Sequence, residues 1–115
     1  IWQRDLSVSH DKVGEGLRAQ GDLDGALDAF RHALVISRRL AQAHPSIAAW
    51  QRAFSYCLRQ LAEFHEQGGQ PSVALPFAEE SLSIDERLSE LDRSNATWQR
   101  DVAVSQALVA RLRGH

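Results

Sequence analysis

The phrase WQRD opens the chain at Trp2–Asp5, returns as WQRA at Trp50–Ala53, and returns again as WQRD at Trp98–Asp101. These phrases contain all three tryptophans of the 115 residues, and positions 2, 50 and 98 are separated by 48 residues in both intervals. A period of about 20 to 50 residues is typical of a solenoid, in which each unit buries its apolar face only against its neighbours. The repeat therefore predicts a stack of similar units.

Each unit contains two predicted helices joined by a glycine-rich turn. In the first unit, apolar residues recur near helical spacing until GDLDG at 21–25 interrupts them. Gly21 suits the left-handed position that ends a helix, and Asp22 or Asp24 can cap the helix that follows. A second apolar stripe then runs until HPS at 44–46. One unit is therefore predicted to be a helical hairpin.

The second unit repeats this plan around the turn QGGQP at 67–71, and the third unit supplies one more helix that ends at Gly114. The fold class predicted is all-α, an α-solenoid of antiparallel helical hairpins with five helices. The chain is expected to be a single domain, residues 1–115. Its predicted units are about 2–49, 50–97 and 98–115.

Pro76 interrupts the pattern of the fourth predicted helix, because it falls about four residues inside that helix. A proline there removes a backbone hydrogen bond and its ring clashes with the preceding turn. We therefore expect the fourth helix to begin late or to have a distorted first turn between Ser72 and Phe77.

Composition and charge narrow the class of protein. Hydrophobic residues make up 43% of the chain, charged residues make up 24%, and the net charge is −2. This balance is typical of a globular protein, and it argues against binding to nucleic acid or an anionic membrane by charge alone. No apolar run reaches the roughly 20 residues that cross a bilayer. The one cysteine, Cys57, favours a reducing, cytoplasmic location.

The absence of methionine, even at the start, predicts a fragment of a longer protein. Twelve arginines against the single Lys12, with abundant alanine, are typical of a GC-rich bacterial genome.

The first hairpin has small or apolar residues at Val13, Gly14, Gly21, Ala26, Phe30, Ala33 and Leu34. In this spacing it resembles the tetratricopeptide repeat. The second copy keeps Leu61, Ala62, Gly69, Ala74 and Leu82. It departs from the motif at Ala78, where an aromatic is preferred, and at Ser81, where alanine is preferred.

The repeat is also longer than the motif, at 48 residues against about 34. Arg38 and Glu86 stand where a proline normally ends the second helix, so that helix should continue to Ala43 in the first unit and to Leu91 in the second. Such long units resemble the kinesin light chain type and the arrays of bacterial signalling proteins.

The repeated tryptophans are predicted to pack between units. Trp50 and Trp98 would cover Leu40 and Leu88 of the preceding helix, while Trp2 has no preceding unit to cover. An aromatic anchor for a peptide is the alternative role.

The repeated arginines Arg4, Arg52 and Arg100 are expected to pair with acids at the preceding helix end or to stay solvated. Glu90 and Asp92 are the acids expected there. A phosphate or carboxylate site is the alternative role of these arginines.

No arrangement of residues typical of catalysis was found. The five histidines do not recur at equivalent positions, and none forms an i, i+4 metal pair with another histidine or with Cys57. Cys57 lies on an apolar stripe, where a buried inert thiol is expected. The sequence predicts no enzyme activity, no metal site and no cofactor, and its mixed charges do not favour nucleic-acid or membrane partners.

The resemblance implies a protein-binding scaffold whose first helices line a concave groove. A family clamp for a C-terminal carboxylate uses lysine and asparagine where this chain has Asp11 and Glu15, so that ligand is not expected. The alternative function is a structural spacer or oligomerisation segment. The predicted groove residues are Val8, Asp11, Glu15, Arg18, Tyr56, Arg59, Glu63, Glu66, Val104, Ala107 and Arg111.

The two ends of the stack are expected to leave apolar surface uncovered. Val102, Val109 and Leu112 belong to the stripe that a second helix of the third unit would share. Because exposed apolar patches mark association sites, the sequence predicts self-association through the ends.

Overall fold

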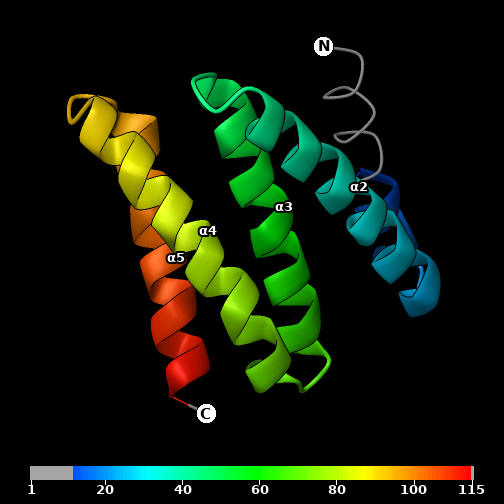
Figure 1. Cartoon of the computed structure of the whole chain (residues 1–115). Helices are drawn as coiled ribbons and strands as arrows, with labels where there is room; N and C mark the ends of the chain where they lie inside the picture. Colours follow the sequence, from blue (N-terminus) through cyan, green and yellow to red (C-terminus); the bar gives the residue numbers. More distant parts are fainter. Residues whose placement is uncertain (1–11, 115) are drawn as a thin grey trace.

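The computed structural model describes residues 12–114, and these residues are helical with no strand among them. Residues 12–19 form one helical segment. The remaining helices are α2 (Leu23–Ala43), α3 (Ala48–Gln67), α4 (Pro71–Leu91) and α5 (Ala96–Arg113). Figure 1 shows the labelled helices side by side, each linked to the next by a short turn. The prediction of an all-α stack of helical hairpins is confirmed.

One glycine turn reverses the chain between the two helices of each hairpin. Gly21 has a φ of 86° and Gly69 has a φ of 74°, which is the left-handed region that favours glycine. The Asp22 side chain then caps α2 by accepting a hydrogen bond from the backbone N–H of Gly25 at 2.9 Å. The turn predicted at 21–25 is confirmed.

The second helices are extended, as the missing proline predicts. α2 continues to Ala43 and α4 continues to Leu91 before the chain turns. The side chain of Asn95 caps α5 by accepting from the backbone N–H of Trp98 at 3.0 Å. Each longer hairpin therefore fills the 48-residue period with helix instead of loop.

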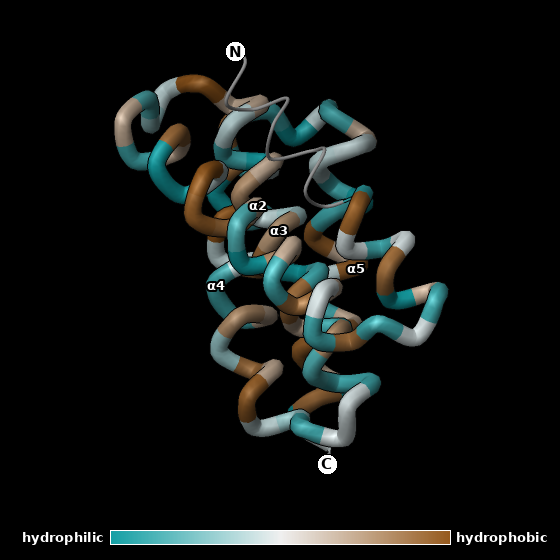
Figure 2. Tube along the Cα trace, turned by 90° about the vertical axis from the view of Figure 1, so that its right-hand side faces the viewer, coloured by the Kyte–Doolittle hydropathy of each residue, from teal (hydrophilic) through white to brown (hydrophobic). Residues whose placement is uncertain are grey.

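The core lies between successive helices. α3 packs against α2 and α4, and α4 packs against α5. Each helix carries one apolar stripe, so brown and teal stretches alternate along the tube in Figure 2. One cluster of buried side chains joins α2, α3 and α4 through residues that include Phe30, Leu58 and Ile84. Burial of these side chains stabilises the stack.

The first hairpin depends on a close approach of two helices. A Cβ atom added at Gly14 would lie 2.8 Å from the Phe30 ring, closer than van der Waals contact allows. In the second hairpin, 48 residues later, Ala62 and Ala78 stand at the two equivalent positions, and both are fully buried. The aromatic of the first hairpin is therefore accommodated by a glycine that the second hairpin does not need.

The prediction at Pro76 is wrong, because α4 runs without interruption from Pro71 to Leu91. Pro71 occupies the start of the helix, where its missing N–H costs no helical bond. Pro76 is exposed, so the Ser72 carbonyl that it leaves without a helical partner lies in the solvent-facing first turns. Ala74 and Ala78 are fully buried on the opposite side, and their packing outweighs one lost hydrogen bond.

The prediction that Val109 and Leu112 form an exposed end face is also wrong. Each of them is only 3% exposed, and they pack in a cluster with Leu108 and the small residues of α3 and α4. Ala62, Ala74 and Ala78 provide the space that these larger side chains fill. Val102 is half-buried. Self-association through the ends stays a prediction, without these two side chains to support it.

The tryptophans that the structure describes occupy two different environments. Trp50 is half-buried in the first turn of α3, where its ring meets the ring of His44 edge-on with centroids 4.5 Å apart. Trp98 is half-buried against the core cluster that contains Leu88. Trp2 lies outside the described residues. The predicted role in packing between units stays a prediction.

Candidate protein-binding surface

Three first-type helices carry the predicted groove, and side-chain bonds link each of them to the next. Glu15 of the segment 12–19 accepts hydrogen bonds from the hydroxyl of Tyr56 at 2.9 Å and from the amide of Gln60 at 3.1 Å. Glu66 of α3 accepts two hydrogen bonds from Arg111 of α5, from Nε at 2.7 Å and from Nη2 at 2.9 Å. We call the exposed side of residues 12–19, α3 and α5 the first-helix face.

Tyr56 and Val104 are the exposed large apolar side chains of α3 and α5. They stand 48 residues apart, at the same position of two successive units, and are 38% and 44% exposed. Val8, the equivalent residue of the first unit, lies outside the described residues, as does Asp11. The ion pairs Arg52–Asp101 and Glu66–Arg111 join α3 to α5, so Tyr56 and Val104 lie on two helices whose side chains meet.

Several charged residues of the predicted groove make polar contacts within the chain. Arg18 donates to the side-chain oxygen of Gln67, and the Arg111–Glu66 pair is bidentate. The bond to Glu66 raises the pKa of the Arg111 guanidinium above its ordinary value. Glu63 is half-buried. Ala107 is exposed. These contacts hold polar side chains of the face in place, while Tyr56 and Val104 are exposed.

A buried polar cluster lies beneath this face and joins three helices. The hydroxyl of Ser55 on α3 donates to Oδ1 of Asp85 on α4 at 2.6 Å, and Ser105 on α5 donates to Oδ2 at 2.5 Å. Ser81 donates to the backbone carbonyl of Ser55 at 3.0 Å. All four side chains are at most 1% exposed. The cluster therefore ties α5 to α3 through a single carboxyl group.

Burial raises the pKa of the Asp85 carboxyl above its ordinary value. The hydrogen bonds from Ser105 and Ser55 and the charge of Arg59 act in the opposite direction, while the charge of Asp101 adds to the increase. A carboxyl group in this position is disfavoured in its charged form despite three compensating contacts.

The sequence predicts that Arg52 pairs with an acid at the preceding helix end or stays solvated. In the structure it pairs instead with the following unit. Its guanidinium lies 2.7 Å from Oδ2 of Asp101 on α5. The final residue of one WQRD phrase therefore meets the arginine of the phrase before it. Glu90 and Asp92 precede Arg100 along the chain, and Arg100 is exposed.

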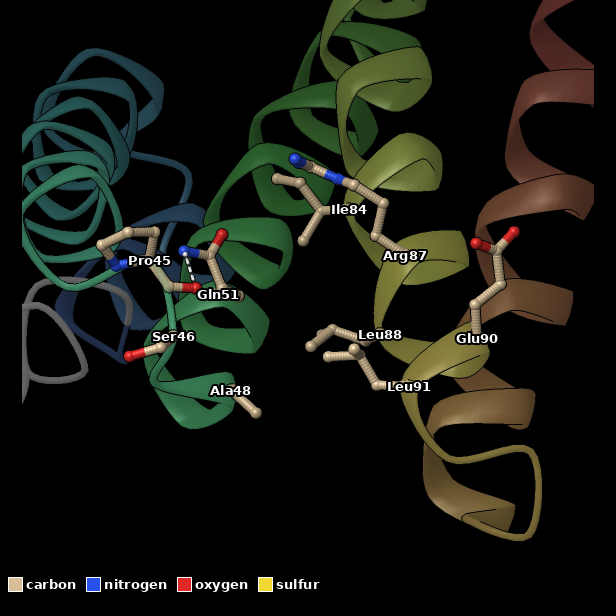
Figure 3. Close-up of a pocket in the computed structure, with 9 residues that line it drawn as sticks. All are labelled: Pro45, Ser46, Ala48, Gln51, Ile84, Arg87, Leu88, Glu90 and Leu91. Carbon is tan, nitrogen blue, oxygen red and sulfur yellow. Dashed lines mark hydrogen bonds between the residues drawn. The ribbon is translucent and has the colours of Figure 1, made fainter.

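A second surface feature is a pocket of about 570 Å³ between the start of α3 and the end of α4 (Figure 3). The loop before α3 and the last turns of α4 line it, and Gln51 is held there by hydrogen bonds to the carbonyls of Ala41 and Pro45. Leu88 forms part of its wall, and Leu91 at its edge is 75% exposed. The sequence analysis did not predict this pocket.

Sequence reasoning also missed the polar cluster around Asp85. The repeat holds one signal for it, because Ser37 and Ala33 of the first unit stand 48 residues before Asp85 and Ser81. A pattern of polar residues at core positions in one unit alone could have marked this interior as different.

Within residues 12–114, no three histidine, cysteine or acidic side chains gather as metal ligands would, and no helix is long and apolar enough to cross a membrane. Cys57 is buried, as predicted. No protein-family model, curated protein or solved structure matches the chain.

Proposed function

We propose that this chain is a protein–protein interaction module of the tetratricopeptide type, which binds a peptide or protein segment on its first-helix face. The observation that carries this proposal is the exposure of Tyr56 and Val104 at the same position of successive units. Exposed aromatic and apolar side chains framed by polar contacts are the common anchors of protein interfaces.

The frame around these two residues supports the proposal. The bonds that link Tyr56 to Glu15 and Arg111 to Glu66 hold side chains of neighbouring helices in place before a partner arrives. Preorganised side chains lose less entropy on binding than free ones do. The mixed charges of the face favour a protein partner over a nucleic acid, which needs a strongly basic surface.

A random peptide library tests this function directly. Peptides selected on the native chain are remeasured against the double variant Tyr56→Ala, Val104→Ala and against a matched control, Val35→Ala, Val73→Ala. The control residues are 49% and 43% exposed but lie on α2 and α4. We expect the first double variant to weaken binding by at least about tenfold and the control to change it less than about twofold.

Equal binding by the two double variants would contradict the proposal. In that case the chain would be better described as a structural spacer or oligomerisation segment, and sedimentation of the native chain would decide between those two roles.

A further inference from the structure

Arg59 lies on α3, about one helical turn from Tyr56, and is largely covered. Only 15% of its side-chain surface remains exposed. Its guanidinium lies 5.8 Å from the centroid of the Tyr56 ring, and its Nη1 lies 3.8 Å from Oδ2 of Asp85. Both Tyr56 and Asp85 are fixed, the first by its bond to Glu15 and the second by two serines. The guanidinium is therefore held in one place.

The described residues around Arg59 do not use its nitrogen donors. A guanidinium has five N–H donors, and the 3.8 Å separation from Asp85 is too long for a hydrogen bond. Each oxygen of Asp85 already accepts a serine hydroxyl. Among residues 12–114, none accepts a hydrogen bond from this guanidinium. Partly buried donors of this kind gain from any acceptor that a partner supplies.

Acidic side chains lie close to the guanidinium of Arg59. Asp85 lies beside it, and Glu63 stands one helical turn further along the same face of α3. A second pair of opposite charges, Arg52 and Asp101, adds no net charge nearby. A carboxylate or phosphate ligand would meet the repulsion of Glu63, and of Asp85 in its ionised form, whereas an uncharged carbonyl oxygen would not.

We propose that Arg59 binds the backbone carbonyl groups of a partner segment that is uncharged and extended, with apolar side chains that contact Tyr56 and Val104. The planar fork of the guanidinium presents two parallel donors, which suit one or two carbonyl oxygens of an extended chain. This inference rests on the proposed function, since it assigns the class of segment that the first-helix face recognises.

The length of an extended chain agrees with this arrangement. A polypeptide in the extended or polyproline conformation advances about 3.1 to 3.4 Å per residue. Side chains of α3 and α5 meet in the ion pairs Arg52–Asp101 and Glu66–Arg111. A short extended segment can therefore contact side chains of both helices, Tyr56 on α3 and Val104 on α5.

Two small probes with the same apolar side chain test the inference by nuclear magnetic resonance. N-acetyl-leucine N-methylamide is neutral and carries two amide carbonyls, whereas N-acetyl-leucinate carries a carboxylate. We expect the neutral probe to shift the Nε–Hε signal of Arg59, with an affinity that changes less than about twofold between low and high salt. The carboxylate probe should bind no more tightly.

Three outcomes would overturn the inference. No shift of the Arg59 signal with either probe would show that the guanidinium is closed to ligands. Binding of acetyl-leucinate at least about tenfold more tightly than the neutral probe, with a steep salt dependence, would assign a carboxylate ligand instead. Equal affinities of the neutral probe for the native chain and for Arg59→Lys, measured from backbone amide shifts, would show that the fork is not the binding group.

Variants separate this inference from the proposed function. Arg59→Lys keeps a positive charge beside Asp85 but removes the fork, so it should keep the fold and weaken the neutral probe by about tenfold. The matched control is Arg39→Lys, at an exposed position of α2. Library peptides that depend on Tyr56 and Val104 but bind Arg59→Lys normally would leave the proposed function intact and contradict the role of Arg59. Thermal unfolding by circular dichroism confirms that each variant is folded.

Discussion

The two helical hairpins use the same backbone plan but fill their interiors in different ways. In the first hairpin the ring of Phe30 packs against the backbone of Gly14. In the second hairpin Ala78 stands at the position of Phe30, and Leu108 of the next helix joins the cluster that contains it. The first hairpin is filled from within its own unit, whereas the second is filled by its neighbour.

The polar content of the two interiors differs as well. Ser37 of the first hairpin satisfies its hydroxyl locally, by donating to the carbonyl of Leu34 at 3.1 Å. At the equivalent position of the second hairpin, Asp85 accepts hydrogen bonds from the hydroxyl groups of Ser55 on α3 and Ser105 on α5. A solenoid can therefore keep its period while single core positions change from apolar packing to hydrogen bonding between units.

The largest effect that tests this comparison is expected from Phe30→Ala and Leu108→Ala. Both side chains are at most 2% exposed, so each variant leaves a cavity and should cost about 2 to 5 kcal/mol in urea unfolding. Leu108 should matter as much as Phe30 although it belongs to another unit. A cost below about 1 kcal/mol for Leu108→Ala would show that the second hairpin is stable without α5.

Gly14→Ala tests the close approach in the first hairpin. The added methyl group would overlap the Phe30 ring, which should cost about 1 to 3 kcal/mol in spite of the higher helix propensity of alanine. In the double variant Gly14→Ala, Phe30→Leu this cost should largely disappear, giving a coupling energy of at least about 0.5 kcal/mol. Additive costs in the double-mutant cycle would contradict the size exchange described for the two hairpins.

The smallest effect concerns the charge of Asp85 and depends on pH. The pKa of this carboxyl is raised in the folded state. Above its ordinary pKa of 3.8, the unfolded chain loses a proton that the folded chain still holds. Stability from this group is therefore greatest at acid pH and falls as the pH rises from about 3.8 through the folded value.

Asp85→Asn removes this titration while keeping an oxygen for Ser55 and an amide for Ser105. Its free energy of unfolding relative to the native chain should therefore rise with pH over that window and level off above it. Urea unfolding of both proteins across this range measures the difference, in which other carboxylates cancel. A difference that stays constant with pH would contradict the raised pKa.

Much of the fold could be predicted from the sequence because its signals are local. Gly21 marks the turn because only glycine enters the left-handed region without strain, and the absence of proline predicts the long second helices. The prediction at Pro76 was wrong because it also relied on a local signal alone. A rule about one backbone bond takes no account of the buried alanines that hold the other side of α4 in place.

The candidate surface could be predicted only in part. The repeat placed Tyr56 and Val104 at one position, and the structure finds both exposed. The pairing of Arg52 with Asp101 could not be read from spacing along one helix, since it joins α3 to α5. The burial of Val109 and Leu112 depended in the same way on the small residues of α3 and α4 that face them.

The sequence by itself determined the period, the helices and their turns, because helix formation and termination follow from residues within a few positions of one another. Only the tertiary structure decided which side chains share an interior. The carboxyl of Asp85, the serines around it and the unused donors of Arg59 come from different parts of the chain. Their burial and hydrogen bonding exist only when α3, α4 and α5 are packed, since solvent satisfies the same groups in the unfolded chain.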